Sequence, residues 1–320
     1  MELNPNNTYK NIKLSKEFVK NEDCIVYLYR LKNGNLITCS QDKEINIYEK
    51  DTLNLLLSWT GHLNSINSIC ELNDSRLVSC SDDRRISIWS YDLKNKISIQ
   101  EIIFIAHNSF INKVITLTDD NIASCSEDHN IYIWNTKPPY NKKCSLLGHK
   151  AEVTSIIQLK NKKIVSGSGN KDGGLMKIWT LDENNNKIIK QDSILNAFCY
   201  CTNSLIEIDN NKVAVGGYKI IRIVNINRKQ IEAKIECHNC LISSITLLND
   251  GCIVSASEEG NISIINPIFY NNLKTIDFAH DMIIFSLCTS NFLSIHSTNS
   301  NNHLCSTFPR LNTCIKKNNN

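Results

Sequence analysis

The sequence predicts an all-β protein built from small sheets that repeat along the chain. The pattern of the segment VSCSDDRRISIW recurs at residues 37–48, 78–89, 123–134, 165–179, 213–224 and 254–265. The ends of these copies are therefore 41 or 45 residues apart. Apolar residues alternate within each copy, which is the period of a half-buried strand. A fixed period of this length is typical of stacked repeat architectures.

Each repeat predicts four short strands in a fixed order. In the second repeat we expect the first three strands at residues 66–72, 77–81 and 86–90. The fourth strand leads into the next repeat, as residues 53–59 do at the end of the first. Turn signals such as Asn33-Gly34 separate the apolar runs. One such sheet cannot bury both of its faces alone, so neighbouring sheets must stack.

A second mark precedes most repeats: a histidine that follows a small residue. The pairs are Gly61-His62, Ala106-His107, Gly148-His149, Cys237-His238 and Ala279-His280. Three of the four tryptophans, Trp89, Trp134 and Trp179, each close a repeat. Scattered catalytic residues would not keep such a period, so these side chains are predicted to be architectural.

These motifs resemble the WD40-repeat β-propeller family over about residues 8 to 310. The resemblance rests on the small residue-His pairs, the Ser-x-Asp turns and a Trp six residues after the Asp. It implies a ring of four-stranded blades in which His, Ser, Asp and Trp form a buried hydrogen-bonded tetrad. The implied tetrads are His62, Ser79, Asp83 and Trp89; His107, Ser124, Asp128 and Trp134; and His149, Ser166, Asp172 and Trp179.

The expected fold is a seven-bladed WD40 propeller that forms one domain over residues 8–310. His280 implies the seventh blade, with strands near 283–287, 292–295 and 303–307. A spare N-terminal strand at 10–19 would complete this blade and close the ring, which leaves no exposed sheet edge there. Residues 1–7 are expected to be a flexible tail and residues 311–320 a disordered Asn/Lys tail.

Three repeats depart from the tetrad. The first has Tyr48 in place of the tryptophan, and the sixth has Glu259 and Ile265 in place of Asp and Trp. In the fifth, Ala214, Tyr218 and Val224 are aligned with the Ser, Asp and Trp positions, and no histidine precedes them. We expect these blades to rely on aliphatic packing.

Composition narrows the function classes. The net charge of +3 is too small to favour nucleic acid as a partner on electrostatic grounds. No apolar run approaches the ~18 residues of a membrane span, and no secretory leader is recognisable. Cysteines at 39, 80 and 125 occupy a slot filled elsewhere by Gly or Ala, so they are expected to be reduced and buried. We expect a cytoplasmic location, with a nuclear one left open.

No metal or cofactor is expected. Cys237-His238-Asn239-Cys240 looks like half of a zinc site, but a tetrahedral site needs further ligands. Serine, histidine and aspartate in three parallel copies favour scaffold over a catalytic triad, which is recognised by unique geometry. We therefore expect no enzymatic activity. The alternative from a different functional class is an enzyme built on a propeller.

The leading hypothesis is a non-catalytic scaffold or adaptor that mediates protein–protein interactions within a larger complex. In the family, residues beside the turn Asp on the top rim often contact partners. This implies a partner surface at Gln41, Asp82, Arg84, Glu127 and Glu258, which would favour a basic peptide. A mixed charged surface that only serves solubility explains the same charges. The alternatives are a substrate-recognition subunit of a ubiquitin ligase and a propeller docked on a ribosome or an RNA-processing assembly.

Overall fold

The computed structural model describes residues 25–297, except 170–173, 183–187, 199–203, 210, 277–283 and 290–292. The described residues form β-strands and no helix, and hence no helix that is long and apolar enough to cross a membrane. The predicted tails at 1–7 and 311–320 lie outside the described residues. The predicted strands at 10–19 and 303–307 lie outside them too.

Four antiparallel sheets follow one another along the chain, each with its four strands in sequence order. The first sheet is β1 (Ile25–Arg30), β2 (Leu36–Ser40), β3 (Glu44–Tyr48) and β4 (Leu55–Thr60). The second is β5 (Ile66–Glu71), β6 (Leu77–Ser81), β7 (Arg85–Asp92) and β8 (Ile97–Ile105). The third is β9 (Ile111–Thr116), β10 (Ile122–Ser126), β11 (Ile131–Trp134) and β12 (Lys142–Leu146). The fourth is β13 (Val153–Gln158), β14 (Ile164–Ser168), β15 (Gly174–Leu181) and β16 (Ile188–Phe198). The predicted strands of the second repeat are confirmed to within two residues.

The next two repeats share one long strand. Their strands are β17 (Leu205–Asp209), β18 (Lys212–Gly216), β19 (Tyr218–Asn225), β20 (Gln230–Leu247), β21 (Ile253–Ser257), β22 (Ile262–Asn266) and β23 (Asn271–Ile276). The first part of β20 pairs with β19, and its second part, from Ile242 onward, pairs with β21. β20 therefore supplies the outer strand of the fifth unit and the inner strand of the sixth. Two further strands, β24 (Ile284–Thr289) and β25 (Leu293–Ser297), pair with each other.

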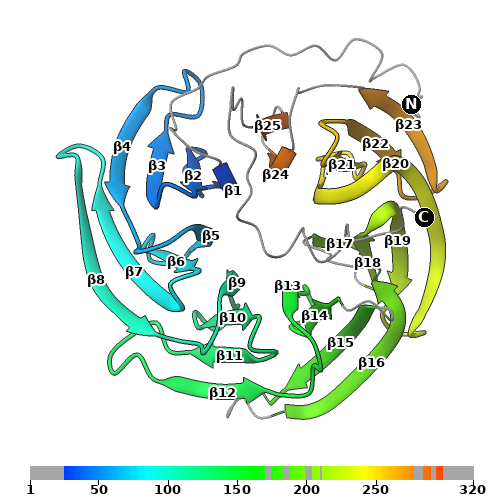
Figure 1. Ribbon diagram of the computed structural model, residues 1–320, viewed down its shortest axis with the longest axis horizontal. Helices are drawn as coiled ribbons and strands as arrows, with labels where there is room; N and C mark the ends of the chain where they lie inside the picture. The colour runs from blue at the N-terminus through cyan, green and yellow to red at the C-terminus, as the bar shows by residue number, and fades with distance from the viewer. Residues whose placement is uncertain are drawn as a thin grey trace, which may run out of the picture.

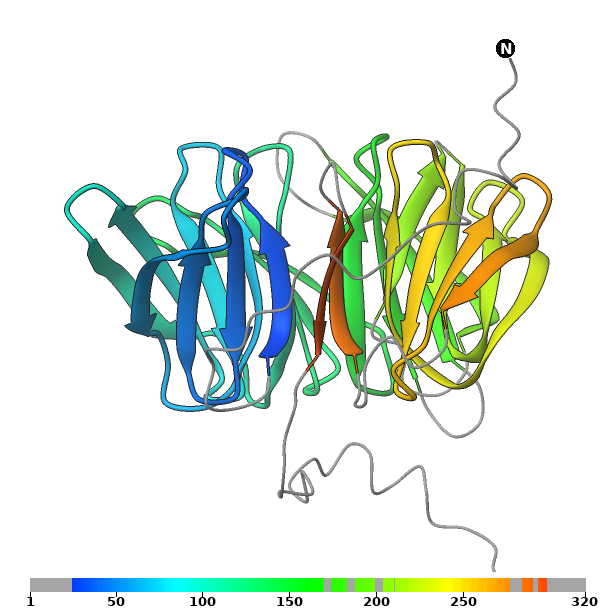
Figure 2. The ribbon, with the colours of Figure 1, turned by 90° about the horizontal axis from the view of Figure 1, so that it is seen from above.

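The sheets stand around a common axis like the blades of a propeller (Figure 1). β1, β5, β9, β13, β17 and β24 lie nearest the axis, and β4, β8, β12, β16 and β23 lie outermost. Seen from the side, the strands run between two rims of loops (Figure 2). The top rim carries the turns between second and third strands and the connections from each outer strand to the next inner one. The bottom rim carries the remaining turns. β24 contacts β1 on one side and β20 and β21 on the other, so the last described strands lie beside the first.

The core lies between neighbouring sheets. In the second sheet, Leu77 and Trp89 pack against the first sheet, whereas Val78 and Ile88 pack against the third. Every residue of β2, β6, β10, β14 and β21 is buried. The expectation of half-buried strands is therefore wrong for these strands, because the polar residues that alternate with apolar ones face a neighbouring sheet and not water. Each fully buried aliphatic side chain contributes about 1.5–3 kcal/mol, so this stacking is the main source of stability.

Candidate functional site

Four side chains of the second sheet form one hydrogen-bonded row. Trp89 Nε1 donates to Ser79 Oγ at 2.8 Å, and Ser79 Oγ lies 2.8 Å from His62 Nε2. His62 Nδ1 lies 2.9 Å from Asp83 Oδ2. Because a carboxylate can only accept, His62 Nδ1–H donates to Asp83, whereas the bond between Nε2 and the serine hydroxyl fits either direction. The row ties the top connection, the second strand, the turn and the third strand together.

The third sheet repeats this row. Trp134 Nε1 donates to Ser124 Oγ at 2.9 Å, Ser124 Oγ lies 2.8 Å from His107 Nε2, and His107 Nδ1 lies 3.0 Å from Asp128 Oδ2. The structure thus brings together the residues that the resemblance placed in the second and third tetrads.

Both tetrad carboxylates are held in the ionised form. Asp128 accepts hydrogen bonds from His107 and from the backbone amides of Asn108 and Asn130, the last two at 3.0 Å. Burial raises the pKa of Asp128, but these hydrogen bonds outweigh burial and lower the pKa to about 2. The pKa of Asp83 is lowered in the same way, against burial and chiefly by His62. At neutral pH these turns are therefore fixed by charge-assisted hydrogen bonds.

The row Ser79, His62 and Asp83 has the order and spacing of a Ser-His-Asp catalytic triad. A nucleophilic hydroxyl must be reached by a substrate, and Ser79 is completely buried. Its Oγ is also bonded to both His62 and Trp89. Ser124 is equally buried and equally bonded in the third sheet. The geometry therefore describes a structural tie and not a reactive centre.

The fourth sheet keeps the inner part of the tetrad. Trp179 Nε1 donates to Ser166 Oγ at 2.8 Å, and Ser166 Oγ lies 2.7 Å from His149 Nε2. His149 Nδ1 lies 2.9 Å from Ser168 Oγ, a contact that the sequence analysis did not anticipate. The predicted carboxylate, Asp172, lies outside the described residues.

In the sixth unit the tetrad is incomplete. His238 Nε2 lies 2.8 Å from Ser255 Oγ, but its Nδ1 is buried without a hydrogen-bond partner. Glu259, which follows Glu258 where Asp83 follows Asp82, is exposed. Burial lowers the pKa of His238 to about 4, so the ring is neutral and one buried donor or acceptor is unsatisfied.

Strand pairing corrects the alignment of the fifth repeat. Val215 and Val224 pack with residues of the fourth sheet, as Trp89 packs with residues of the first. Ala214 belongs to the cluster shared with the sixth unit. Val215 and not Ala214 therefore occupies the serine position, because the connection from β18 to β19 is one residue shorter than that from β6 to β7.

The predicted partner residues lie in the top-rim turns. Gln41, Asp82, Glu127 and Glu258 each directly follow the second strand of a sheet, and we call these four the inner row. Backbone amides of the inner row bond to carbonyls beside the inner strands: Asp82 to Ser65, Glu127 to Phe110 and Glu258 to Leu241, each at 3.0 Å. The strand ends therefore place the inner row near the axis of the ring.

The three acidic residues of the inner row differ in their partners. Asp82 Oδ1 accepts from Asn67 Nδ2 at 2.6 Å, and Glu127 Oε2 accepts from Ser109 Oγ at 3.3 Å. The Glu258 carboxylate makes no hydrogen bond or ion pair within the described part of the chain. Burial raises the pKa of Glu258 to about 7. Glu258 is thus a partly desolvated carboxyl group that a cation would stabilise.

A second row on the top rim consists of Lys43, Arg84, His129 and Lys219, and we call it the outer row. All four are exposed and have positive φ values of 72°, 69°, 70° and 65°. In the β21–β22 turn, Gly260 takes this conformation with φ 79°. The left-handed region costs a residue with a Cβ about 1–2 kcal/mol, so a glycine would suit all these turns. Of these four, only Arg84 was predicted from the sequence, although Lys43 and His129 also directly follow an aspartate of the turn.

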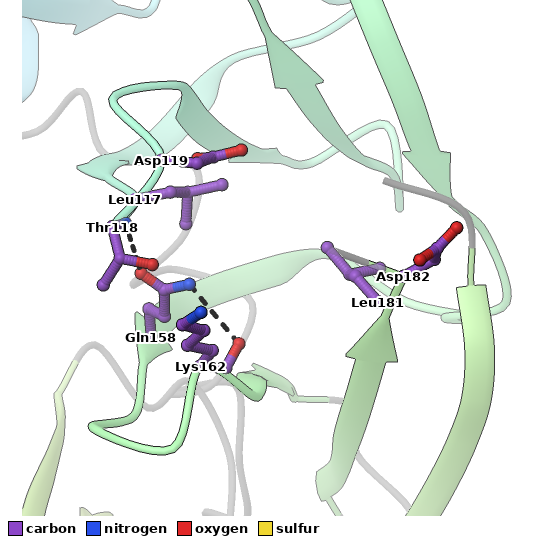
Figure 3. Close-up of a pocket in the computed structure, with 7 residues that line it drawn as sticks. All are labelled: Leu117, Thr118, Asp119, Gln158, Lys162, Leu181 and Asp182. Atoms are coloured by element: carbon purple, nitrogen blue, oxygen red, sulfur yellow. Dashed lines mark hydrogen bonds between the residues drawn. The ribbon is translucent and has the colours of Figure 1, made fainter. Parts of the chain in front are cut away.

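The bottom rim has a small cavity of about 80 Å³ between the third and fourth sheets (Figure 3). Gln158 joins two of its walls: its Oε1 accepts from the amide of Thr118 at 2.8 Å, and its Nε2 donates to the carbonyl of Lys162 at 3.3 Å. Sites for cofactors and drug-sized ligands measure roughly 300–1,000 Å³. This cavity can therefore take one short side chain or a few waters.

The half zinc site does not assemble in the described residues. No three His, Cys, Asp or Glu side chains among them lie close enough to hold a metal ion. Burial raises the pKa of Cys237 to about 12, so this residue is a thiol at neutral pH in the structure as described.

Acid should weaken the tetrad turns first. Because the pKa of Asp128 falls from 3.8 to about 2 on folding, Asp128 stabilises the fold above pH ~4 and loses this effect as the pH falls toward 2. We predict that Asp128→Asn is less stable than the wild type by about 1–3 kcal/mol at pH 7 and that this difference shrinks toward pH 2. Urea unfolding at pH 7, 4 and 2.5 measures it. A difference that does not change with pH would contradict the assignment.

Completing the tetrad of the sixth unit should stabilise the protein. Glu259→Asp places a shorter carboxylate where Asp83 and Asp128 bind their histidines, and His238 Nδ1 then gains a partner. We expect the free energy of unfolding to rise by about 1 kcal/mol. The matched reverse change, Asp83→Glu, should lower it. Urea titrations compare the two variants with the wild type. A Glu259→Asp protein that is no more stable than the wild type would show that the shorter carboxylate does not reach the His238 ring.

Comparisons with known proteins agree with this architecture. The family model "WD domain, G-beta repeat" matches residues 53–90 and 99–135. The crystal structure of the WD40 beta propeller domain of Doa1 aligns with a TM-score of 0.67 over 84% of this chain and 88% of that chain, at 18% sequence identity. A search of curated proteins found no match to this chain. A likeness at this identity concerns the fold and not the partner. The chain therefore contains WD40 repeats and has an all-β, WD40 propeller-like fold.

Proposed function

We propose that this protein is a non-catalytic interaction module that binds a basic peptide segment of a partner protein on its top rim. WD40 propeller domains generally mediate protein–protein interactions. The observation that carries the proposal for this chain is the inner row, where three turns present carboxylates in the same position over the inner strands.

The inner row provides a graded set of acceptors. Asp82 and Glu127 are already oriented by Asn67 and Ser109, so a partner finds them preorganised. Glu258 has no such partner and is partly desolvated, so an ammonium or guanidinium group beside it regains a charge-assisted hydrogen bond. A lysine or arginine of the partner is therefore drawn toward the axis of the ring.

The outer row restricts which peptide sequences match the charges of the top rim. Lys43 and Arg84 are exposed cations farther along two of the same turns, and Lys219 is an exposed cation at the start of β19 in the fifth unit. The inner row is acidic and the outer row basic, so the best-matched segment carries Lys or Arg at its centre and Asp or Glu beside it. A uniformly basic segment meets repulsion from the outer row, which restricts the choice of partner.

We also propose that the ring has seven blades and that residues 10–19 complete the last one. The described part of this blade is the pair β24 and β25, and β24 lies in contact with both β1 and β20. A blade of two strands would leave an unpaired edge between the first and sixth units. A strand from the N-terminal segment would cover that edge and fix the ring that carries the two rows.

Reversing the charges of the inner row should weaken peptide binding. We predict that Asp82→Arg with Glu127→Arg and Glu258→Arg weakens binding of a peptide with a central Arg by at least about tenfold, because complementary charges become like charges. Fluorescence anisotropy measures the affinity of peptides from an array of Lys- and Arg-centred sequences. The matched control reverses Asp51, Asp209 and Asp250 on the bottom rim and should bind as the wild type does.

The pH dependence of peptide affinity tests the role of Glu258 independently. Because the pKa of Glu258 is about 7, peptide binding should tighten between pH 6 and pH 8 as Glu258 ionises, by up to roughly tenfold. Glu258→Gln should flatten this dependence. Equal affinity for the triple variant and the wild type, with no pH dependence, would refute the inner row as the binding surface.

Removing the N-terminal segment should destabilise the ring. We predict that deletion of residues 1–19 lowers the melting temperature by several degrees, whereas deletion of residues 1–7 leaves it unchanged. The cause is the loss of the strand that pairs in the last blade. Thermal unfolding followed by circular dichroism compares the two deletions. Identical melting temperatures would exclude residues 10–19 from the propeller.

A further inference from the structure

Lys177 is a buried lysine where the third and fourth sheets meet, and it has no counter-ion among the described residues. It lies on β15, pairs with Ser166 of β14 and has only 6% of its surface exposed. Trp179, two residues later and so on the same face, packs against the third sheet. Lys177 Nζ lies 5.5 Å from the centroid of the Trp179 ring. No hydrogen bond or ion pair of this ammonium group is found within the described residues, and Nζ is not among the fully buried unpaired atoms, so it keeps contact with solvent at the end of a buried stem.

The equivalent position is satisfied in the second sheet. In the second sheet, Ser87 accepts a hydrogen bond at 3.2 Å from Gln100, the residue paired with Trp89. In the fourth sheet the residue paired with Trp179 is Gln191. Lys177 thus places an ammonium group, which can only donate, where the second sheet has the acceptor Ser87, and the amide nitrogen of Gln191 can donate beside it.

Both donors converge on Gly148, in the top connection between β12 and β13. A Cβ on Gly148 would lie 3.3 Å from Lys177 Nζ and 3.2 Å from Gln191 Nε2. Gly148 is exposed and has φ +131°, a conformation that disfavours a side chain. The same place beside Gly61 is filled by aliphatic carbons of Ile45 and Ile66. Gly148 therefore keeps the two donors close to solvent.

The surroundings of this corner are positive. Burial and the neighbouring charge of Lys150 lower the pKa of Lys177. Burial, Lys177 and His129 lower the pKa of His149 to about 3. Lys150 and His129 are both exposed, and they approach from the β12–β13 connection and the β10–β11 turn. An anion at this corner would meet two ammonium groups and an amide donor.

We propose that Lys177 and Gln191, which meet at Gly148, form with Lys150 of the same β12–β13 connection an anion site that takes the phosphate group of a phosphorylated serine or threonine on a partner protein. A phosphate dianion has several acceptor oxygens, which matches three separate donors and two positive charges. Leu147, 55% exposed beside Gly148, offers an apolar contact for the residue next to the phosphate. The site goes beyond the proposed function, since the inner row takes a cation and this corner takes an anion.

Two variants test the site. Lys177→Met keeps the buried aliphatic stem and removes the charge. Gln191→Glu places a carboxylate beside Lys177, so the internal ion pair should raise the melting temperature and block the anion. Lys160→Met, at an exposed lysine of the bottom rim, is the matched control. The Gln191→Glu variant keeps the test decisive if Lys177→Met does not fold.

The probes are inorganic phosphate and three peptides that differ only in a central phosphoserine, glutamate or serine. In the wild type and in Lys160→Met, phosphate should raise the melting temperature more than chloride of equal ionic strength does. The phosphoserine peptide should bind at least about tenfold tighter than the serine peptide. Both effects should vanish in Lys177→Met and Gln191→Glu, while binding of the Arg-centred peptide to the inner row is unchanged.

Three results would overturn the proposal. Phosphate effects that persist in both variants would place the anion elsewhere. A glutamate peptide that binds as tightly as the phosphoserine peptide would make this corner a carboxylate site. Stabilisation by inorganic phosphate without preference for the phosphoserine peptide would assign the site to the free anion and not to a partner protein.

Discussion

Every sheet of this protein has two faces that must be kept from water, and no sheet can cover both by itself. The consequence is visible in β6, where Leu77 faces the first sheet, Val78 faces the third and all five residues are buried. Stacking around an axis satisfies this requirement sheet by sheet. The rims, where the loops lie, are then free to carry side chains for other purposes.

The tetrads connect this packing to the top rim. A tryptophan and a serine buried within the sheet are joined through a histidine to a turn carboxylate, as in Trp89, Ser79, His62 and Asp83. The turn is thereby fixed relative to the core, and the residue before the carboxylate is fixed with it. The tetrad weakens along the chain: the sixth unit keeps His238 but leaves its Nδ1 unsatisfied, and the fifth has Val215 and Val224 instead. The second and third sheets thus hold their top turns more firmly than the fifth and sixth units do.

The top rim of this chain offers charges of both signs at defined radii. Asp82 and Glu127 lie near the axis, and Arg84 and His129 follow them in the same turns at a backbone conformation that glycine would adopt more easily. Holding side chains in that conformation costs stability, as it also does in the bottom-rim turns at Ser75, Asp120 and Lys162. Lys177 is another buried charged residue near these turns, and no carboxylate among the described residues pairs with it.

The sequence by itself determined the repeat and the strands, and its resemblance to the WD40 family named the members of two complete tetrads. It could do so because one structural unit recurs, so that each copy checks the others: Trp89 and Trp134 follow Asp83 and Asp128 at one spacing. Where the repeat drifts, the sequence failed. It placed Ala214 in the serine position because a shortened turn is invisible without strand pairing. It also read alternation as half-burial, because a single strand does not reveal that a second sheet covers its polar face.

Only the tertiary structure decided which polar groups are satisfied. Glu258 and Glu127 look alike in the sequence, but Ser109 reaches Glu127, and burial raises the pKa of Glu258 to about 7. Lys177 looks like any strand lysine until Gln191 and Gly148 are placed beside it. Partners of a side chain come from other strands and other sheets, many residues away in the chain. Local sequence fixes the backbone period, whereas hydrogen bonding and desolvation depend on neighbours that only folding brings together.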